Sequence, residues 1–437
     1  MLARTLILAG GLLLAGCKTQ PAPGSTGSSA SLLPALPLAP PSPGTRAALE
    51  VVALGDRDFA ARLYARVSAQ QGNLSFSPTS IRLALAMAYE GARGDTKAQM
   101  GRVLALDDGA SAGFAALLTQ WSVLAAPSPS GATGSEAERK PLVLRLANRL
   151  WGLRGRAFRS DFLGRLRDDY GAPLEELDFK GTTEASRNII NAWVAEQTDR
   201  KVQDLLGPES VTEDTRLVLT NAVYFKASWA SGFSPAATQA EDFTTASART
   251  VKAPMMRNVG YFPHAALMAG GVPCAALQLP YGAKGIAMVV LLPDAKDGLV
   301  KLEARIDSGF LDAATRGFAT KRVDVAFPRF KTTGSLSLGD MLSAMGMPAA
   351  FARRKADFSA MDDTHELFLG AVVHQAFVSV DEKGTEAAAA TAGVMERAGM
   401  PTDPPVPFHA DHPFLFLIAD LTNQTVLFMG RVIDPSV

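Results

Sequence analysis

The sequence predicts an α+β fold built around large mixed β-sheets. From about residue 46 to the C-terminus, helical and strand-like patterns follow one another without the strand–helix–strand rhythm of a parallel sheet. No internal repeat and no clear break divides this stretch. The chain has 437 residues, of which 47% are hydrophobic and 20% charged, so it can bury one large core.

Periodicity places the expected elements along the chain. Helices are expected over residues 49–68, 80–89 and 182–198, and the second is the most apolar. Thr182 or Thr183 is the expected N-cap of the third helix. Residues 127–140, rich in Ser, Gly and Ala, have the composition of a surface loop. Strands are expected over residues 142–151, 217–225, 275–280, 286–292, 322–327, 372–380, 414–418 and 426–429.

The first 16 residues predict an export signal. They carry one early cation, Arg4, and an apolar run over residues 6–14 that is too short to span a bilayer. They lead into Cys17 through Leu14-Ala15-Gly16, which resembles the signal of bacterial lipoproteins. In such proteins the chain is cleaved before the cysteine, which is then acylated and anchors the chain in a membrane.

Residues 17–45 are expected to form a linker. They are rich in Pro, Ser, Gly and Ala and almost uncharged, so they cannot build a packed core. The folded domain is expected over residues 46–437. Export across the inner membrane and a lipid anchor at the outer membrane or cell surface are therefore predicted, with Lys18 after the cysteine favouring the outer membrane.

Charge and cysteine content exclude several classes of protein. Lys plus Arg and Asp plus Glu number 43 each, so no overall basic field exists to bind nucleic acid. A local excess of arginine over residues 145–167 leaves two interpretations open, a solvated basic face or a polyanion site. Cys17 and Cys274 stand in different settings, so no disulfide framework is expected, and the apolar surroundings of Cys274 are typical of a buried side chain.

Short motifs follow one another over most of the chain. They are NLSFSPTSI (73–81), GARGDT (91–96), NAVYFK (221–226) with Trp229, LQLPY (277–281), LLP (291–293), ADFS (356–359), VHQA (373–376), DEKGTEAAAAT (381–391), FHADHPF (408–414) and LFMGR (427–431).

In these motifs, their order and their spacing, the chain resembles the serpin family of serine protease inhibitors from about residue 58 to 435. The resemblance implies the serpin fold, with a large central sheet, two smaller sheets, surrounding helices and an exposed reactive loop over about 382–407. It implies a suicide-substrate inhibitor of serine proteases, not an enzyme, which needs no cofactor or metal and acts as a monomer.

The expected reactive loop has the pattern of a strand that can enter a packed sheet. With a period of two, one face carries only small or apolar residues, whereas Glu386 and Glu396 share the other face. Gly384 supplies backbone freedom at the hinge. The small face consists of Thr385, Ala387, Ala389, Thr391, Gly393 and Met395, and the hinge consists of Glu382, Gly384, Thr385, Ala387, Ala388, Ala389 and Ala390.

The family mechanism, carried over by resemblance, is that a protease is acylated by the loop, which then inserts into the central sheet and stalls deacylation. Counting from Glu382 places the reactive bond between Ala398 and Gly399, with Arg397 and Met400 as alternatives. A small residue before the bond favours elastase- or chymotrypsin-like proteases, whereas Arg397 would favour trypsin-like ones.

The resemblance also assigns supporting residues. Ser77, Ser80, Asn191 and His374 match the hydrogen-bonded network that controls opening of the sheet. Trp229 matches the aromatic residue at the point of first insertion, and Arg329 matches the ion-pair partner of Glu382. Taken alone, His374 and Trp229 are also typical of ordinary core residues.

Other functions remain as alternatives. A non-inhibitory serpin acting as a binding protein would usually lack the small-residue hinge. Inhibition of papain-like cysteine proteases would keep the mechanism and change the target. A hydrolase or metal protein is disfavoured, because none of the five histidines stands with a recognisable nucleophile, and His409-Ala410-Asp411-His412 crowds its ligands into one turn.

Overall fold

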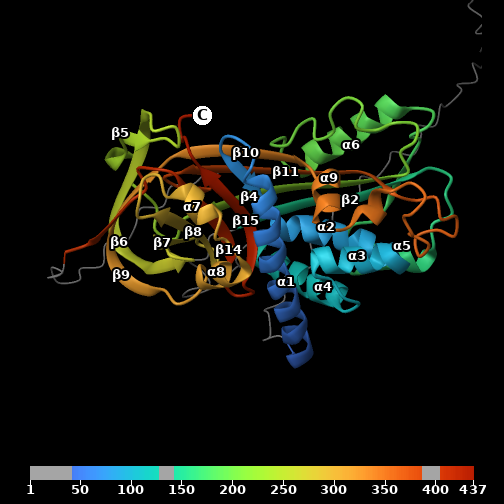
Figure 1. The fold of residues 1–437 in the computed structure, drawn as a ribbon, viewed down its shortest axis with the longest axis horizontal. Helices are drawn as coiled ribbons and strands as arrows, with labels where there is room; N and C mark the ends of the chain where they lie inside the picture. Colours follow the sequence, from blue (N-terminus) through green and yellow to red (C-terminus); the bar gives the residue numbers. More distant parts are fainter. Residues whose placement is uncertain (1–41, 127–141, 386–403) are drawn as a thin grey trace, which may run out of the picture. The chain divides into compact units, whose positions relative to one another are not determined.

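The first residues of the expected hinge, Gly384 and Thr385, lie in a mixed six-stranded sheet (Figure 1). The computed structural model describes residues 42–126, 142–385 and 404–437. In these residues β11 runs parallel to β4, and the short β12 lies antiparallel to both. The order is β10 (Phe330–Ser337), β11 (Leu369–Asp381), β12 (Gly384–Thr385), β4 (Leu217–Ser228), β2 (Val143–Leu153) and β3 (Glu175–Leu177).

The other described strands form a nine-stranded sheet. Its path is β1 (Leu74–Phe76), β15 (Thr425–Val432), β14 (Phe414–Asp420), β8 (Ile286–Pro293), β7 (Val272–Pro280), β6 (Thr250–Ala269), β9 (Ala319–Pro328) and β13 (Val406–His409), and β5 (Gln239–Thr244) pairs with β6.

The 20-residue strand β6 explains why this sheet differs from the two smaller sheets that were expected. It pairs with β9 over Met255–His264 and with β7 over His264–Ala269. It therefore joins the strands that follow β9 to those that precede β7 in one continuous sheet. The predicted α+β class is confirmed, whereas the expected division into a central and two smaller sheets is not what the pairing shows.

Helix α2 (Pro78–Gly91) is the core helix of the molecule. It begins after Ser77, whose hydroxyl oxygen accepts a hydrogen bond from the Ser80 backbone N–H at 3.2 Å, and Pro78 suits the first turn. Nearly every residue of α2 is buried, since it packs on β4 and β2 on one side and β15 on the other. The sequence prediction of a buried helix here is confirmed.

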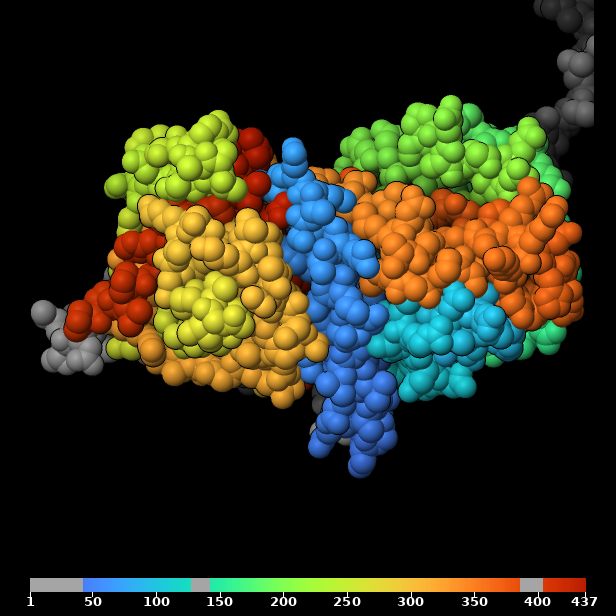
Figure 2. Space-filling model, viewed as in Figure 1, coloured from blue at the N-terminus to red at the C-terminus, as the bar shows by residue number. Residues whose placement is uncertain are grey.

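The remaining helices lie around this core. Helix α1 packs on α2, α4, α8 and β15 and crosses the face shown in Figure 2 in blue. The helices are α1 (Pro43–Val67), α3 (Gly94–Leu104), α4 (Ala110–Ala125), α5 (Ser160–Asp168), α6 (Thr183–Gln197), α7 (Leu299–Glu303), α8 (Ser308–Ala313) and α9 (Gly339–Met345). Within the described ranges, none of the helices has the length and apolar character to cross a membrane.

Each helix and strand expected from periodicity is present, with ends shifted by a few residues. The elements that had not been expected are helices α3, α4, α5, α7, α8 and α9 and strands β1, β3, β5, β6, β10 and β13. Strand β6 contains Pro254 and Pro263, which argue against a strand when only the sequence is read. The expected loop at 127–140 lies outside the described residues.

Candidate functional site

The chain reverses after β11 and re-enters the six-stranded sheet as β12. Gly384 and Thr385 pair antiparallel with the end of β11 on one side and the end of β4 on the other. The Thr385 side chain is fully buried, and its hydroxyl oxygen lies 2.6 Å from the Tyr281 hydroxyl oxygen. Gly384 and Thr385 therefore lie between two parallel strands, with Thr385 on the buried face.

Only glycine fits at position 384. Its φ is +150°, a backbone conformation that other residues rarely adopt. A Cβ atom there would lie 2.1 Å from the Ala227 carbonyl oxygen and 2.7 Å from the Ser228 Cα. The close approach of β12 to β4 thus depends on the absence of a side chain.

The Glu382 carboxylate holds the turn before β12. It accepts hydrogen bonds from Arg329 Nε at 2.7 Å and from the Thr238 hydroxyl at 2.5 Å, and the residue is 5% exposed. Burial alone would raise the pKa of this carboxyl, but the hydrogen bonds from Arg329 and Thr238 outweigh it and leave the pKa below its ordinary value. The ion pair between Glu382 and Arg329 that the sequence indicated is present.

Trp229 lies at the mouth of the seam between β11 and β4. Its indole N–H donates to the Asp381 carbonyl oxygen at 2.9 Å, and its backbone N–H donates to the Lys383 carbonyl oxygen at 2.9 Å. The indole stacks on Tyr281, with ring centroids 4.5 Å apart and planes 12° apart. Trp229 thus holds the turn before β12 and stacks on Tyr281, which contacts Thr385.

Below β12 the seam is closed by direct pairing. Strands β11 and β4 pair in parallel from Phe377–Tyr224 down to Leu369–Leu217. Between β12 and this paired stretch lie Val378 and Ser379 of β11. Among the described strands, neither residue has a partner on β12 or β4. The seam is therefore occupied at its mouth by β12 and closed further down.

A buried histidine bridges the closed part of the seam. His374 on β11 pairs with Asn221 on β4, and its Nε2 accepts a hydrogen bond from the Ser77 backbone N–H at 3.0 Å. Its Nδ1 must then carry the proton that it donates to the Asn221 side-chain oxygen. Burial lowers the pKa of His374 to about 3, so the ring is neutral at physiological pH.

The Asn221 side chain extends the network to α2 and β2. Its amide nitrogen donates to the Ser80 hydroxyl oxygen at 2.6 Å, to the Ser80 carbonyl oxygen at 3.1 Å and to the Asn148 side-chain oxygen. Three residues named from the sequence, Ser77, Ser80 and His374, are brought together here. Asn148 had not been foreseen, since nothing in its sequence context sets it apart.

The assignment of Asn191 to this network is corrected by the structure. Asn191 lies on α6, where its side-chain oxygen accepts from the Leu206 backbone N–H at 2.8 Å and its amide donates to the Leu206 carbonyl oxygen at 3.0 Å. Asn221 takes the place expected for it. Asn221 could have been identified from the sequence, because it begins the motif NAVYFK, on which part of the resemblance rests.

The remaining residues named from the sequence lie outside the described residues: Cys17, Ala387, Ala388, Ala389, Ala390, Arg397, Ala398, Gly399 and Met400.

The arginines at 145–167 are largely paired with acids. Arg145 reaches Asp199 at 2.7 Å, and Arg159 reaches Asp363 at 3.0 Å. Arg165 lies 3.3 Å from Glu90. This pairing favours a solvated, charge-balanced face over a polyanion site.

Hydrolase and metal chemistry find no support in the described residues. The pentapeptide Gly109–Gly113 has the G-x-S-x-G spacing of a hydrolase nucleophile elbow, but it forms the N-cap and first turn of α4 and follows a helix, whereas such an elbow needs a strand before it. No cluster of three His, Cys, Asp or Glu side chains suited to a metal occurs among these residues. Cys274 is buried, as the sequence predicted.

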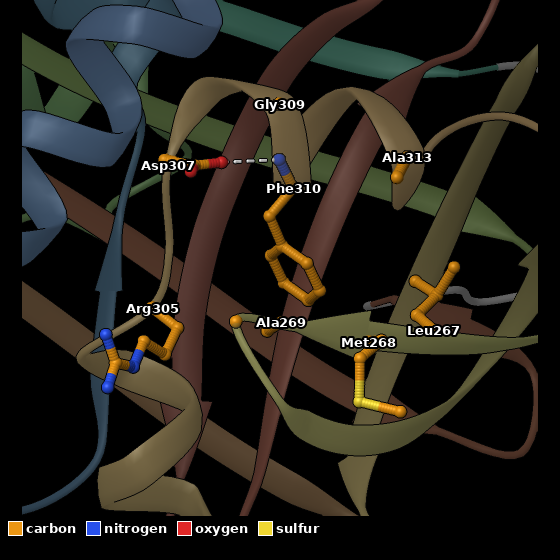
Figure 3. A pocket seen from close by; sticks show the side chains of 9 residues that line it. Leu267, Met268, Ala269, Arg305, Asp307, Gly309, Phe310 and Ala313 are labelled. Atoms are coloured by element: carbon orange, nitrogen blue, oxygen red, sulfur yellow. Dashed lines mark hydrogen bonds between the residues drawn. The ribbon is translucent and has the colours of Figure 1, made fainter.

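A cavity of about 200 Å³ lies between the β6–β7 turn and α7–α8 (Figure 3). Asp307 beside it accepts a hydrogen bond from the Phe310 backbone N–H at 2.7 Å, so this carboxylate caps α8. The β6–β7 turn and Tyr281 stand at opposite ends of β7, which at roughly 3.3 Å per residue separates them by about 26 Å. The cavity is therefore distinct from the hinge.

A mixed sheet whose seam receives the first residues of a hinge is the feature that defines the serpin class of proteins. The family model described as serpin (serine protease inhibitor) matches residues 55–435. The chain therefore belongs to the serpin family, whose members are generally protease inhibitors.

Similar proteins agree with this assignment. An uncharacterized serpin-like protein of Thermococcus kodakarensis is 40% identical over 382 residues, which cover 86% of this chain and 84% of the relative. Leukocyte elastase inhibitor of Equus caballus is 35% identical, over 89% of this chain and 100% of the relative.

Solved structures show the same fold. Uncleaved ovalbumin matches with a TM-score of 0.77 at 28% identity, over 88% of this chain and 100% of its own. Serpin48 of the insect Tenebrio molitor, described as highly specific, matches with a TM-score of 0.75 at 29% identity, over 88% of this chain and 98% of its own.

Proposed function

We propose that this serpin is a suicide-substrate inhibitor of serine proteases. The protease would attack the reactive loop, form an acyl-enzyme and be trapped when the cleaved loop inserts between β11 and β4. The observation that carries the proposal is β12, which already pairs antiparallel with both strands at the mouth of the seam.

The register of β12 predicts how insertion proceeds. Extended by two residues, it would bring Glu386 and Ala387 beside Ser379 and Val378, in rows where no β11–β4 pair has to break. From Ala388 onward, each inserted residue would replace one parallel pair with two antiparallel ones. Antiparallel pairing is slightly more stable per residue, so the exchange favours insertion.

The same register predicts which side chains face the core. Val378 and Ala376 are buried on β11, and they stand in the rows that Ala387 and Ala389 would enter. Thr391 would enter the row of His374 and Asn221, where its hydroxyl meets the buried polar network. The small face read from the sequence therefore suits the buried side of an inserted strand.

Insertion would carry the protease along the sheet. About 16 residues at roughly 3.3 Å each correspond to a displacement of about 50 Å. A protease held by its acyl bond would be pulled against the far end of the sheet, where distortion of its active site stalls deacylation. The inhibitor is consumed in the process.

The target class is inferred from the reactive bond. Cleavage after Ala398 favours elastase- or chymotrypsin-like proteases, and the similarity to leukocyte elastase inhibitor of Equus caballus supports that choice. Trypsin-like proteases, through Arg397, and papain-like cysteine proteases are the alternatives.

Trapping assays test the proposal. The protein is incubated with elastase, chymotrypsin, trypsin, subtilisin and papain, followed by denaturing gels and mass analysis of the released peptide. We expect gel-stable complexes with elastase or chymotrypsin and a peptide that begins at Gly399. If trypsin releases a peptide that begins at Ala398 and no complex forms with elastase, the reactive bond follows Arg397 instead.

Melting of the cleaved protein tests insertion itself. Cleaved protein should melt far above intact protein, because an inserted strand would add antiparallel pairs to both β11 and β4. An unchanged melting temperature after cleavage would reject insertion and favour the non-inhibitory alternative.

The location is a separate proposal, which rests on residues 1–45. We expect full-length protein to partition into detergent and to label with palmitate, while Cys17→Ser does neither. The anchor is rejected if both forms partition equally into the aqueous phase.

A further inference from the structure

The first half of helix α1 is apolar on nearly every side. Within Pro43–Gly55 the charged residues are Arg46 and Glu50, whereas the second half of the helix carries acids and arginines throughout. A helix that is apolar all round is normally buried on all sides. This part of α1 is therefore expected to have a neighbour on each face.

One face of this segment is packed against α4. Leu49, Val52 and Ala53 on this face are buried. The two helices approach so closely that a Cβ atom on Gly113 of α4 would lie 2.5 Å from Val52 Cγ2 and 2.7 Å from the Ala48 carbonyl oxygen. The contact with α4 thus accounts for one side of the helix.

On the opposite face, the described residues leave three apolar side chains open to solvent. Val51 is 43% exposed and Leu54 is 63% exposed, and Ala47 is exposed as well. Spacings of four and three residues place the three side chains in one row, which we call the α1 stripe. Figure 2 shows the start of α1, in dark blue, projecting beyond its neighbours. An apolar row of this kind is typical of a contact surface.

The chain just before α1 has the composition of a partner for the α1 stripe. Residues 36–41 have the sequence LPLAPP, which is apolar and uncharged. Pro34, Pro37 and Pro40 recur at every third residue, which is the period of a polyproline II helix. Such a helix is stiff before it binds, so packing it on a surface costs little conformational entropy. The chain also enters α1 close to this conformation, since Ser42 has φ −55° and ψ 158°.

The lengths of the two segments match. Leu36 precedes Ser42 by about 19 Å of polyproline II chain, at roughly 3.1 Å per residue. Val51 follows Ser42 by about 14 Å of helix, at roughly 1.5 Å per residue. The difference of about 5 Å leaves room for the chain to reverse its direction. The same offset brings Leu38 to the level of Ala47.

We propose that residues 36–41 fold back as a polyproline II helix and pack on the α1 stripe, with Leu36 beside Val51. This segment is favoured over a separate partner, because a short tether holds it at an effective concentration in the millimolar range. The folded part of the protein then begins at Leu36, inside the stretch that composition alone assigns to a linker. The inference is independent of the inhibitory function and of the lipid anchor.

Disulfide trapping tests the contact. The test pair is Leu36→Cys with Val51→Cys, and the control pair is Leu36→Cys with Ala112→Cys. All variants also carry Cys17→Ser, so the native cysteine that remains is Cys274, which is buried.

The control position lies within reach of the same tether but away from the α1 stripe. Ala112 is exposed on α4, next to Gly113 and therefore close to Ala48. Ala48 is about 9 Å along α1 from Ser42, and packed helices lie about 8–10 Å apart. A freely moving segment would therefore reach both partners.

We expect the test pair to oxidise about tenfold faster than the control pair, because docking raises the local concentration of one thiol beside the other. Non-reducing gels and mass analysis of the linked peptides measure both rates. Adding Leu54→Asp to the test pair should remove the difference, since a carboxylate in the α1 stripe would lose its hydration beneath the docked segment. The melting temperature of this variant should stay unchanged, because Leu54 is exposed on the described chain.

A labelling experiment needs no second cysteine. Val51→Cys, in the Cys17→Ser background, should react with a maleimide about fivefold more slowly than the same variant with Leu36→Ser and Leu38→Ser, because labelling then waits for local opening.

Equal oxidation rates of the two pairs would overturn the proposal, because the segment would then move freely. Equal labelling rates with and without the serine substitutions would overturn it as well. Disulfides formed mainly between two chains would assign the α1 stripe to a second copy of this protein. Labelling that slows only when phosphatidylglycerol vesicles are added would assign it to a membrane surface. Either of these last results also overturns the proposal.

Discussion

The two ends of the seam between β11 and β4 are built in contrasting ways. At the mouth, β12 already lies between β11 and β4. Glu382, Gly384 and the stacked pair of Trp229 and Tyr281 hold it there. Lower down, β11 and β4 pair directly, and His374 and Asn221 bridge them through a buried hydrogen bond. In the proposed mechanism, insertion would begin at the mouth and the lower seam would resist it.

This contrast explains how one sheet can hold two arrangements. In the lower seam β11 and β4 pair directly, from Phe377–Tyr224 to Leu369–Leu217, so these backbone groups have partners without the loop. The same groups would be satisfied by an inserted strand, at no loss of hydrogen bonds. If the loop inserts as proposed, the direct pairs of the lower seam and the buried network around His374 would have to break first, and they would form the barrier to insertion.

The largest expected effect is at the mouth, with Thr385→Arg. Thr385 is fully buried, and an arginine there would require burial of an unpaired charge, which costs several kcal/mol. Insertion should then be slower than deacylation, so the protease cleaves the loop and leaves active. Residual protease activity and the yield of gel-stable complex measure this.

The matched control is Glu386→Arg, on the opposite face of the same segment. We expect it to inhibit nearly as well as the parent, because that face would meet solvent in an inserted strand. If the two variants trap protease equally well, the buried position of Thr385 has no part in the mechanism.

A smaller effect is expected from Gly384→Ala. The new methyl group would meet the Ala227 carbonyl oxygen and the backbone of Ser228, which forces β12 away from β4. We expect a loss of about 2–3 kcal/mol of unfolding free energy and a higher fraction of loop cleaved without trapping. Urea unfolding and the stoichiometry of inhibition measure the two effects.

Gly155→Ala separates steric contact from backbone strain. Gly155 also has a positive φ, +82°, but nothing lies within 4 Å of the position of a Cβ. It should lose only about 1 kcal/mol and keep full trapping. Equal losses at both positions would show that contact with β4 is unimportant.

Acid is expected to weaken the lower seam. The pKa of His374 falls from 6.5 to about 3 on folding. Between these two pH values the imidazole is therefore protonated in the unfolded chain and neutral in the folded chain. The contribution of His374 is complete above about pH 6.5 and declines as the pH falls from there toward 3. Between pH 6.5 and 5 the loss should be about 2 kcal/mol, measured by urea unfolding.

His374→Gln removes the titrating ring while keeping hydrogen-bonding groups. Its stability should change less than that of the parent over this range. Glu382 does not affect this comparison. Because its pKa is lowered, its contribution to the stability of the fold is lost only when the pH falls below the ordinary pKa range of a carboxyl group. Identical pH profiles for parent and His374→Gln would assign the acid sensitivity to other groups.

The smallest effect is expected from Arg329. Its side chain is 45% exposed, but its partner Glu382 is 6% exposed, so Arg329→Ala leaves a buried carboxylate with one partner fewer. We expect a loss of about 1 kcal/mol, discounted for the exposure of the arginine, and a smaller loss for Arg329→Lys. Arg353→Ala, which breaks an exposed pair with Asp214, should change stability by less than about 0.5 kcal/mol. If Arg353→Ala costs as much as Arg329→Ala, burial of Glu382 adds nothing to the hinge.

Elements with a strong local signal were predictable from the sequence. The apolar helix α2 and the alternating strand β11 were found because burial on one or both faces imposes a period on the chain itself. Strand β6 was missed because Pro254 and Pro263 oppose a strand locally, and only pairing with β9 and β7 compensates for them.

Within the site, the error at Asn191 has the same origin. An asparagine on a helix and an asparagine on a strand carry similar local signals. Asn221 is identified as the partner of His374 only once β4 and β11 lie side by side, 153 residues apart in the chain. Ser77, Ser80 and His374 could be named from their motifs. Asn221 also begins a motif, NAVYFK, but only the pairing of β4 with β11 shows that it, and not Asn191, joins them.

The sequence by itself determined the chemistry of the hinge: a glycine where the backbone must approach another strand, and a small residue on every second position after it. These requirements are local, because steric contact and the period of a strand restrict the residue types at consecutive positions. Only the tertiary structure decided where that segment starts, how far the seam is already filled, and which side chains close the rest. Those features arise from contacts between residues distant in the chain, such as Ser77 and His374, which are 297 positions apart and meet only when the core has formed.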